Sequence, residues 1–346
     1  MSKSYLDVVK ECDNFPYYTD NPTLYNACLQ NYYAFKVSGC SQILGYVPKY
    51  IIHAFDFSQR PGWDVRHETR ELTLGHPPNQ DTQSDNPNTK ESLTSLMSNT
   101  LTHLSKIPHH PEFTSLQKSW RNESFPIYDT TGGTLLLTID RCASALFGIL
   151  TTGVQLTCYV NDANGLGLRI WIGRRSRSKQ TYPGLLDNTA AGGLETGMAP
   201  LEGVVREAVE EAALDEGVVR GGVRGVGALS YWHVMPPAPI SSQSGSSPEV
   251  EKVGMLQPEI EYIYELELDS ATVPRPGDSE VEEFYLMSVD EVSIALRNGE
   301  FKLNSAIVLI DFFIRHGIVT AENEPGYFDI VTRLHRRLAF PTGVSA

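Results

Sequence analysis

Three glutamates on one short segment have the residue type and the spacing to hold a divalent cation. The segment AAGGLETGMAPLEGVVREAVEEAALDEG (190–217) begins in a glycine-rich loop and continues as a helix over about 200–213, for which Pro200 suits the first turn. Successive helical residues are about 100° apart, so Glu207, Glu210 and Glu211 cluster on one face. Hard oxygen ligands suit Mg²⁺, with Mn²⁺ as the alternative, and phosphate groups commonly complete such sites.

A solvated acidic face is the alternative interpretation of these glutamates, but the charge pattern argues against it. Like charges three or four residues apart destabilise a helix by roughly 0.2–0.5 kcal/mol per pair, and no lysine at those spacings offsets them here. A bound cation would remove that cost. The opposite face is apolar and mostly built of small residues, which predicts close packing on a sheet; it comprises Leu201, Val205, Ala208, Val209 and Ala212.

The same segment resembles the Nudix box, G-x5-E-x7-R-E-U-x-E-E-x-G-U, in which U is a bulky aliphatic residue. The box positions that match are Gly192, Arg206, Glu207, Glu210, Glu211 and Leu214. The resemblance implies that the three glutamates bind the divalent metals and that Arg206 orients a glutamate by ion pairing. It also implies hydrolysis of a diphosphate on a Nudix α/β/α sandwich with a mixed sheet.

Two positions depart from the box. Met198 stands where its first glutamate belongs, and Ala213 stands where its late glycine belongs. Glu195 and Glu202 are the candidates to replace the missing carboxylate. The departures keep open a second class of function, a non-catalytic module that binds a diphosphate without cleaving it.

A basic stretch lies immediately upstream, in IWIGRRSRSKQTYPGLLDNTAAGG, and is similar to a stretch of isopentenyl-diphosphate isomerases. That similarity implies that Arg175 and Lys179 hold a diphosphate, while Gly192 and Gly193 let the substrate approach the backbone. The isomerase reaction itself is disfavoured. Its reactive cysteine and metal-binding histidine would fall at Ala191 and Gly193, neither of which can do that chemistry.

Further segments resemble a fungal and plant Nudix group described as thiamine pyrophosphokinase-related. They are YPGLLDN, EIEYIYELEL, DSEVEEFYLMSVDEV, IDFFIRHG and, nearer the N-terminus, WRNESFPIY. This resemblance implies hydrolysis of thiamine diphosphate, or of its damaged oxo or oxy derivatives, to the monophosphate and phosphate. A nucleoside diphosphate derivative such as ADP-ribose is the alternative substrate.

The resemblance also gives candidates for the remaining roles at such a site. Glu280, which precedes the predicted strand EEFYLMSV, fits the position of the general base, with Glu261 as the second candidate. Tyr231, Trp232 and Tyr182 are aromatic residues that could stack on a heterocycle.

The composition of the chain limits which partners it can bind and in which cellular compartment we expect it. The chain has 346 residues with 42 acidic and 28 basic side chains, a formal net charge of −14, which disfavours binding to nucleic acid or to an anionic membrane. Its five scattered cysteines form no C-x-x-C pair, and no apolar run reaches membrane-spanning length. We therefore expect a cytoplasmic protein that binds a small diphosphate substrate; the sequence does not fix its oligomeric state.

The element pattern predicts two domains and a tail. Residues 1–130 are expected to form a smaller α+β domain, 131–320 the Nudix domain and 321–346 a helical tail. In the second domain few helices interrupt the strands, and some strands pair as hairpins, which favours a mixed α/β sandwich over a doubly wound parallel sheet. Two polar segments, 76–92 and 236–252, are expected to be loops.

Overall fold

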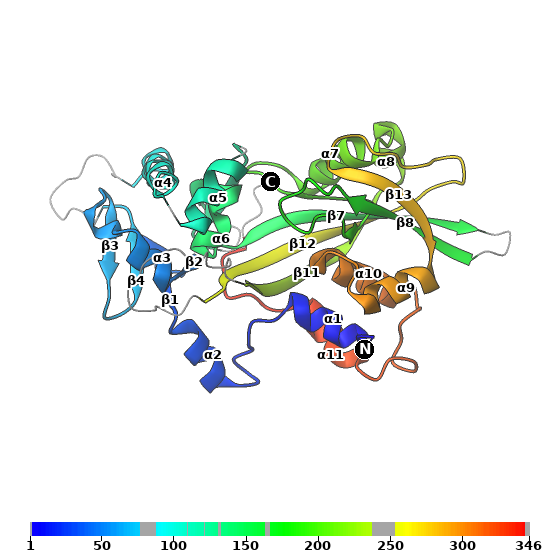
Figure 1. Ribbon diagram of the computed structural model, residues 1–346, viewed down its shortest axis with the longest axis horizontal. Coiled ribbons are helices and arrows are strands. Elements are labelled where there is room, and N and C mark those ends of the chain that lie inside the picture. Colours follow the sequence, from blue (N-terminus) through cyan, green and yellow to red (C-terminus); the bar gives the residue numbers. More distant parts are fainter. Residues whose placement is uncertain are drawn as a thin grey trace.

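Two sheet-based units lie side by side in the computed structural model, which describes residues 2–76, 88–108, 110–120, 122–130, 133–162, 167–236 and 253–342 (Figure 1). Of the two segments expected to be loops, 77–87 and 237–252 lie outside these residues, whereas a helix begins at Lys90, inside the first segment. None of the helices in the described ranges is long and apolar enough to span a bilayer.

The N-terminal unit is built on a four-stranded sheet with the order β2-β1-β4-β3. Its strands are β1 (Tyr32–Val37), β2 (Gly45–Pro48), β3 (Trp63–Arg66) and β4 (Glu71–Leu74). Only the β1–β4 pairing is parallel. The helices of this region are α2 (Pro22–Leu29), α3 (Lys49–Ala54), α4 (Lys90–Leu104), α5 (Pro111–Ser119) and α6 (Ser144–Phe147).

A two-stranded hairpin connects this unit to the second one. It pairs β5 (Ser124–Tyr128) with β6 (Leu135–Asp140), and a short 3₁₀ turn, Arg141–Ala143, follows it. The apolar side chains of the hairpin join the N-terminal core, which continues as far as Ile149. The hairpin therefore spans the boundary predicted near residue 130, and residues 133–149 pack with the first unit.

The C-terminal unit contains a seven-stranded mixed sheet, which confirms the expected mixed α/β architecture. The main order is β11-β12-β7-β8-β13; β10 also pairs with β7 and β9 with β8. The strands are β7 (Thr151–Asp162), β8 (Gly167–Arg175), β9 (Leu186–Asp187), β10 (Ala190–Gly193), β11 (Arg224–Met235), β12 (Met255–Glu267) and β13 (Val281–Ser288). The β7–β12 pair is parallel and the other pairs are antiparallel.

Helices cover both faces of this sheet (Figure 1). Because side chains alternate along a strand, Val154, Leu156 and Cys158 of β7 pack toward α7 (Pro200–Ala212), which α8 (Glu216–Gly222) follows. Tyr159 projects to the other face and packs on Phe312. That face carries α9 (Val289–Asn298), α10 (Leu303–Arg315), α11 (Tyr327–Leu334) and α1 (Tyr5–Cys12). The result is a three-layered α/β/α arrangement.

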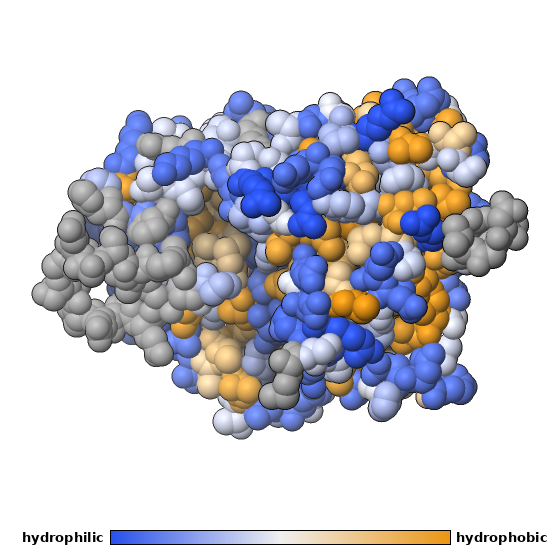
Figure 2. Space-filling view, turned by 45° about the vertical axis from the view of Figure 1, so that its right-hand side comes forward, coloured by the Kyte–Doolittle hydropathy of each residue, from blue (hydrophilic) through white to orange (hydrophobic). Residues whose placement is uncertain are grey.

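The first helix of the chain packs in the C-terminal unit, although the sequence placed it with residues 1–130. Tyr5, Val8 and Val9 of α1 are buried against α10 and α11. Just beyond α1, the buried carboxylate of Asp13 accepts a hydrogen bond from Arg336 Nη1 at 2.9 Å. The two ends of the chain are thereby joined. Over the face drawn in Figure 2, hydrophobic residues are exposed in patches between hydrophilic ones.

Candidate active site

Helix α7 presents two of its glutamates to the sheet, which differs from the expectation. Glu207 and Glu211 are each only 9% exposed, whereas Leu201 and Val209, predicted to be buried, are 44% and 39% exposed. Glu210 is exposed, which agrees with the alternative interpretation of a solvated face at this one position. The predicted orientation of α7 about its axis was therefore wrong by part of a turn. The sheet beneath α7 exposes glycine backbone, and the glutamate carboxylates pack against it.

The glycine strand β10 provides that space. Gly192 pairs with Val154 of β7, so its missing side chain would project toward α7. A Cβ at position 192 would lie less than 3.0 Å from the carboxylate carbon and Oε1 of Glu207. Glycine at this position is thus what allows the Glu207 carboxylate to lie against the strand.

Glu207 and Glu211 form a buried pair of like charges. Glu211 Oε2 accepts a hydrogen bond from the backbone N–H of Ala191 at 2.9 Å. Burial raises the pKa of Glu211 to about 8, and the neighbouring Glu207 charge adds to the effect. Burial also raises the pKa of Glu207, and Arg206 offsets this only in part. When both carboxylates are ionised, the site therefore holds more negative charge than its own cations neutralise.

Arg206 lies between two carboxylates. Its Nη1 donates to Glu195 at 2.8 Å and its Nη2 to Glu207 at 2.9 Å. Met198, at the position where the box has its first glutamate, packs with the apolar core beside Gly203. Glu195, three residues earlier, thus supplies the carboxylate on the loop side of Arg206.

Strand β12 carries a third buried carboxylate, on the α10 face of the sheet, opposite the face that α7 covers. Glu261 Oε1 accepts a hydrogen bond from Asn304 at 2.7 Å, while its Oε2 has no hydrogen-bond partner among the described residues. A Cβ on Gly153 would lie 2.5 Å from Glu261 Oε2 and 3.0 Å from the carbonyl oxygen of Gly192. Burial raises the pKa of Glu261 to about 7, with the charge of Glu259 adding to it.

These oxygens fit a divalent cation of the hard, oxygen-preferring kind. No three His, Cys, Asp or Glu side chains already converge as a metal site within the part of the chain described here. The donor set nevertheless suits Mg²⁺ or Mn²⁺, because Glu207 and Glu211 are buried with excess negative charge. The residues that would hold the ion are Glu207 and Glu211; Glu210 would have to reach it from the exposed side of the helix.

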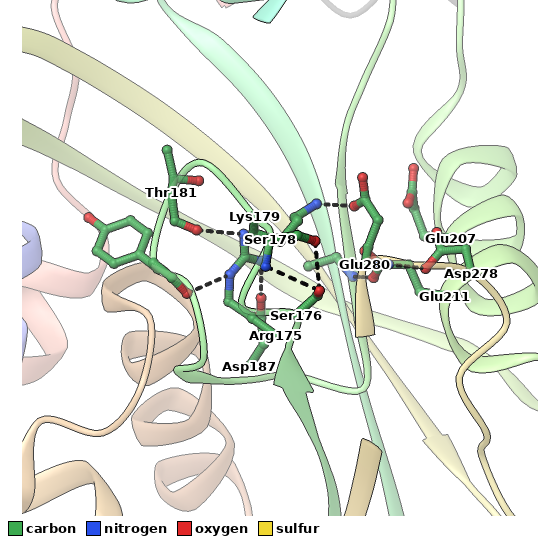
Figure 3. A network of polar contacts seen from close by, with 12 residues as sticks. Arg175, Ser176, Ser178, Lys179, Thr181, Asp187, Glu207, Glu211, Asp278 and Glu280 are labelled. Atoms are coloured by element: carbon green, nitrogen blue, oxygen red, sulfur yellow. Dashed lines mark hydrogen bonds and ion pairs between the residues drawn. The ribbon is translucent and has the colours of Figure 1, made fainter. Parts of the chain in front are cut away.

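The basic stretch forms a loop whose cations are internally paired (Figure 3). The buried Arg175 donates from Nη1 to Asp187 at 2.7 Å, and its other nitrogens donate to the backbone carbonyls of Tyr182 and Thr181. Lys179 forms an ion pair with Glu280, the predicted base, just before β13. Arg175 thus shapes the loop, and Lys179 and Glu280 lie at the end of it that is nearer α7.

The predicted aromatic residues lie apart from one another. Tyr231 and Trp232 are neighbours on β11, so they point to opposite faces of the sheet. The Tyr231 hydroxyl donates to Glu259, whereas Trp232 packs on Phe15 with 4.2 Å between ring centroids. Tyr182 is half-buried and has φ +52°. Of these three aromatic residues, Tyr231 is the one that forms a hydrogen bond with an acidic residue of β12.

Sequence reasoning missed the residues that reach this site from distant elements. Asn304 lies in the first turn of α10, and Lys302, just before that helix, acts electrostatically on both Asp187 and Glu261. Neither position belongs to a recognisable local motif, so no signal in the sequence could have found them.

The mixed α/β fold of the C-terminal unit agrees with the family comparison. Residues 152–305 match a family model described as NUDIX domain. The match covers less than half of the chain and falls in the C-terminal unit; the separate N-terminal sheet lies outside the matched range.

Similar proteins extend the comparison beyond that domain. "Uncharacterized protein YJR142W" of Saccharomyces cerevisiae is 40% identical over 225 residues, 65% of this chain and 64% of the yeast protein. "Nudix hydrolase 20, chloroplastic" of Arabidopsis thaliana is 34% identical over 218 residues, 63% of this chain and 53% of the plant protein. The chain thus spans less than two thirds of these relatives' lengths. A solved MutT protein from Methanosarcina mazei aligns over 48% of this chain and 95% of its own, with 14% identity and a TM-score of 0.33.

Proposed function

We propose that the protein is a metal-dependent hydrolase of a diphosphate (phosphoric anhydride) bond. The observation that carries this proposal is the buried carboxylate pair Glu207 and Glu211, which faces the glycine strand β10 with more negative charge than nearby cations offset. Buried charge is costly unless it is paired, and a divalent cation together with a phosphate group is the partner that suits these oxygens.

Each residue has a part in this reaction. Glu207 and Glu211, with Glu210, would hold Mg²⁺, which when bound neutralises phosphate charge and makes water a better nucleophile. Arg206 holds Glu207 in place through its paired hydrogen bonds with Glu195 and Glu207. Gly192 and Gly193 remain predicted substrate-binding residues; both lack a side chain and are only partly buried.

Two carboxylates are candidates for the base that takes a proton from water. Glu280 is neutralised by Lys179, and a carboxylate paired with an ammonium group is a weaker proton acceptor. Oε2 of Glu261 accepts no hydrogen bond from the residues that the structure describes, and burial raises the pKa of this group to about 7, near the pH at which a general base works best. Glu280 lies on the side of Glu207 and Glu211, whereas Glu261 lies on the α10 face of the sheet, so both remain candidates for the base.

The substrate we propose is thiamine diphosphate or its oxo or oxy derivatives, cleaved to the monophosphate and phosphate. The support is the resemblance of the segments around YPGLLDN and EIEYIYELEL to the thiamine pyrophosphokinase-related group. Arg175, Lys179, Tyr231 and Trp232 remain predicted substrate-binding residues. A Nudix box reports diphosphate chemistry without fixing the group attached to it, so ADP-ribose is the competing substrate.

The test is turnover by the full chain with Mg²⁺ or Mn²⁺, the products being separated by anion-exchange chromatography. The substrates are oxothiamine diphosphate, thiamine diphosphate and ADP-ribose. The variant Glu211→Gln should lower kcat by about 100-fold or more, since it removes a metal ligand outright. The matched control is Glu202→Gln, an exposed acid on the same helix, which should stay within about twofold of the parent.

The possible outcomes distinguish a thiamine diphosphate hydrolase, an ADP-ribose hydrolase and a non-catalytic binding module. Cleavage of a thiamine compound that is lost in Glu211→Gln supports the proposal. Preference for ADP-ribose supports the hydrolase and overturns the thiamine assignment. Binding of diphosphates to folded, metal-loaded protein without any turnover would overturn the enzymatic proposal in favour of a binding module.

A further inference from the structure

The hairpin of the N-terminal unit docks on the Nudix loop. Both the backbone N–H and the hydroxyl of Thr196, in the loop between β10 and α7, donate to the carbonyl oxygen of Ser124 in β5, at 2.8 and 2.9 Å. A Cβ on Gly193 would lie 2.7 Å from Cζ of Phe125, the next residue of that strand. The glycine strand therefore packs directly against the N-terminal unit.

Arg141, which directly follows this hairpin, lies over the same glycine. Its guanidinium carbon is 3.5 Å from the position that a Cβ on Gly193 would take, and it lies 5.8 Å from the ring centroid of Phe125. The side chain is 44% exposed, so a ligand can reach it. Glu123, Glu259 and Glu207 all act on it electrostatically.

Arg141 makes fewer hydrogen bonds than Arg206 and Arg175, two of the other cations near the site. Nη1 donates to Glu123 at 2.7 Å, and its remaining nitrogens make no hydrogen bond to the residues that the structure describes. Arg206 is shared by two carboxylates, Lys179 is paired with Glu280, and the nitrogens of Arg175 are used within its own loop. Arg141 thus has guanidinium N–H groups that bind none of the described residues, and it lies near Glu207.

We propose that Arg141 binds a phosphate group of the substrate, so that the N-terminal unit completes the diphosphate site of the Nudix domain. This inference rests on the proposed function. An arginine presents a planar fork of donors that matches phosphate oxygens. A diphosphate that binds beside β10 meets this fork on the side of the strand opposite Glu207. Arg141 there adds a positive charge, which balances the phosphate charge that the metal does not neutralise.

The test measures binding separately from turnover. The probe is methylenediphosphonate, a diphosphate analogue that cannot be hydrolysed, titrated by calorimetry into the full chain with Mg²⁺. Arg141→Gln should raise Kd by about 10-fold or more, as expected for the loss of a charge-assisted hydrogen bond. Arg141→Lys should recover part of this loss. The matched control is Arg66→Gln, an exposed arginine of the same unit that pairs with Asp64.

Glu123→Gln separates a binding role from a structural one. Removing that carboxylate leaves Arg141 more available for phosphate, so the analogue should bind about 2–5-fold more tightly. If Arg141 only held the hairpin in place, both variants would weaken binding and lower the melting temperature together.

The outcomes are distinct from those of the function test. Opposite effects of Arg141→Gln and Glu123→Gln support the inference even if no substrate is turned over. Unchanged affinity in folded Arg141→Gln would overturn it, as would a parent protein that binds no analogue while it cleaves its substrate. With an active parent, Arg141→Gln should raise KM more than it lowers kcat.

Discussion

The carboxylate of Glu207 occupies the space into which a side chain at position 192 would project. A Cβ on Gly192 would lie less than 3.0 Å from the carboxylate carbon and Oε1 of Glu207. The two residues are fifteen positions apart, one on the short strand β10 and the other on the helix that follows it. Glycine is therefore needed at the first position of the box because the glutamate at its central position fills the space that a side chain would take.

Gly192→Ala should damage the site without removing any charged group. The added methyl group must push Glu207 away from the strand, at a cost of about 1–3 kcal/mol in unfolding free energy. Metal affinity should fall about 10–100-fold with it. The measurements are the Mg²⁺ dependence of turnover and urea denaturation. Gly221→Ala is the control, since nothing lies within 4 Å of a Cβ there. Equal metal dependence in both variants would contradict the coupling.

Glu210→Gln tests the third carboxylate of the box. Because Glu210 is exposed while Glu211 is buried, we expect its replacement to lower turnover less than Glu211→Gln does and to raise the Mg²⁺ concentration needed for half-maximal rate. Titration of activity with Mg²⁺ measures both quantities, with Glu202→Gln as the reference. A loss as deep as that of Glu211→Gln would show that Glu210 turns inward to the metal.

Ala213→Gly should stabilise the protein. Ala213 ends α7 in a left-handed conformation, φ +48° and ψ +35°, which a glycine adopts without strain. Relief of that strain should raise the free energy of unfolding by about 1 kcal/mol. Ala212→Gly, one residue earlier and within the helix, should lower it by a similar amount. Urea denaturation of both variants checks the signs; stabilisation by neither would contradict the assignment of strain.

Asp187→Asn should destabilise the protein at neutral pH but much less in acid. Burial alone would raise the pKa of Asp187, but Lys302, Arg175 and Ser305 outweigh it and lower the pKa below its usual value. A lowered pKa in the folded state means that the charged form stabilises the fold above about pH 4, and that this contribution is lost as the pH falls through the folded value.

Denaturation at pH 7, 5, 4 and 3 measures this effect. The difference between parent and Asp187→Asn should be about 3–5 kcal/mol from pH 7 to 5, since the buried Arg175 and the partly buried Lys302 lose their partner, and should shrink below pH 4. Asp64→Asn, which breaks an exposed ion pair, should change stability by less than about 1 kcal/mol throughout. A difference for Asp187→Asn that does not depend on pH would refute the assignment.

Much of this fold could be predicted from local patterns. The box register, the Pro200 start of α7, the Glu-rich helix and the mixed sheet all follow from spacing and periodicity over short stretches. Arg206 could be expected to pair with a glutamate, although its second partner, Glu195, is not the residue at the box position. The helix of the tail, α11, was also predicted from its amphipathic pattern.

The sequence by itself determined which residues carry the chemistry that we propose, because the box is a contiguous pattern whose residues share one loop and one helix. Only the tertiary structure decided which carboxylates are buried and what faces them. Val209 is exposed and Glu211 buried because the sheet beneath α7 offers glycine backbone rather than an apolar surface. Glu261 and Arg141 come to that glycine strand from β12 and from the N-terminal hairpin. Such contacts join residues far apart in the chain, so no local pattern records them.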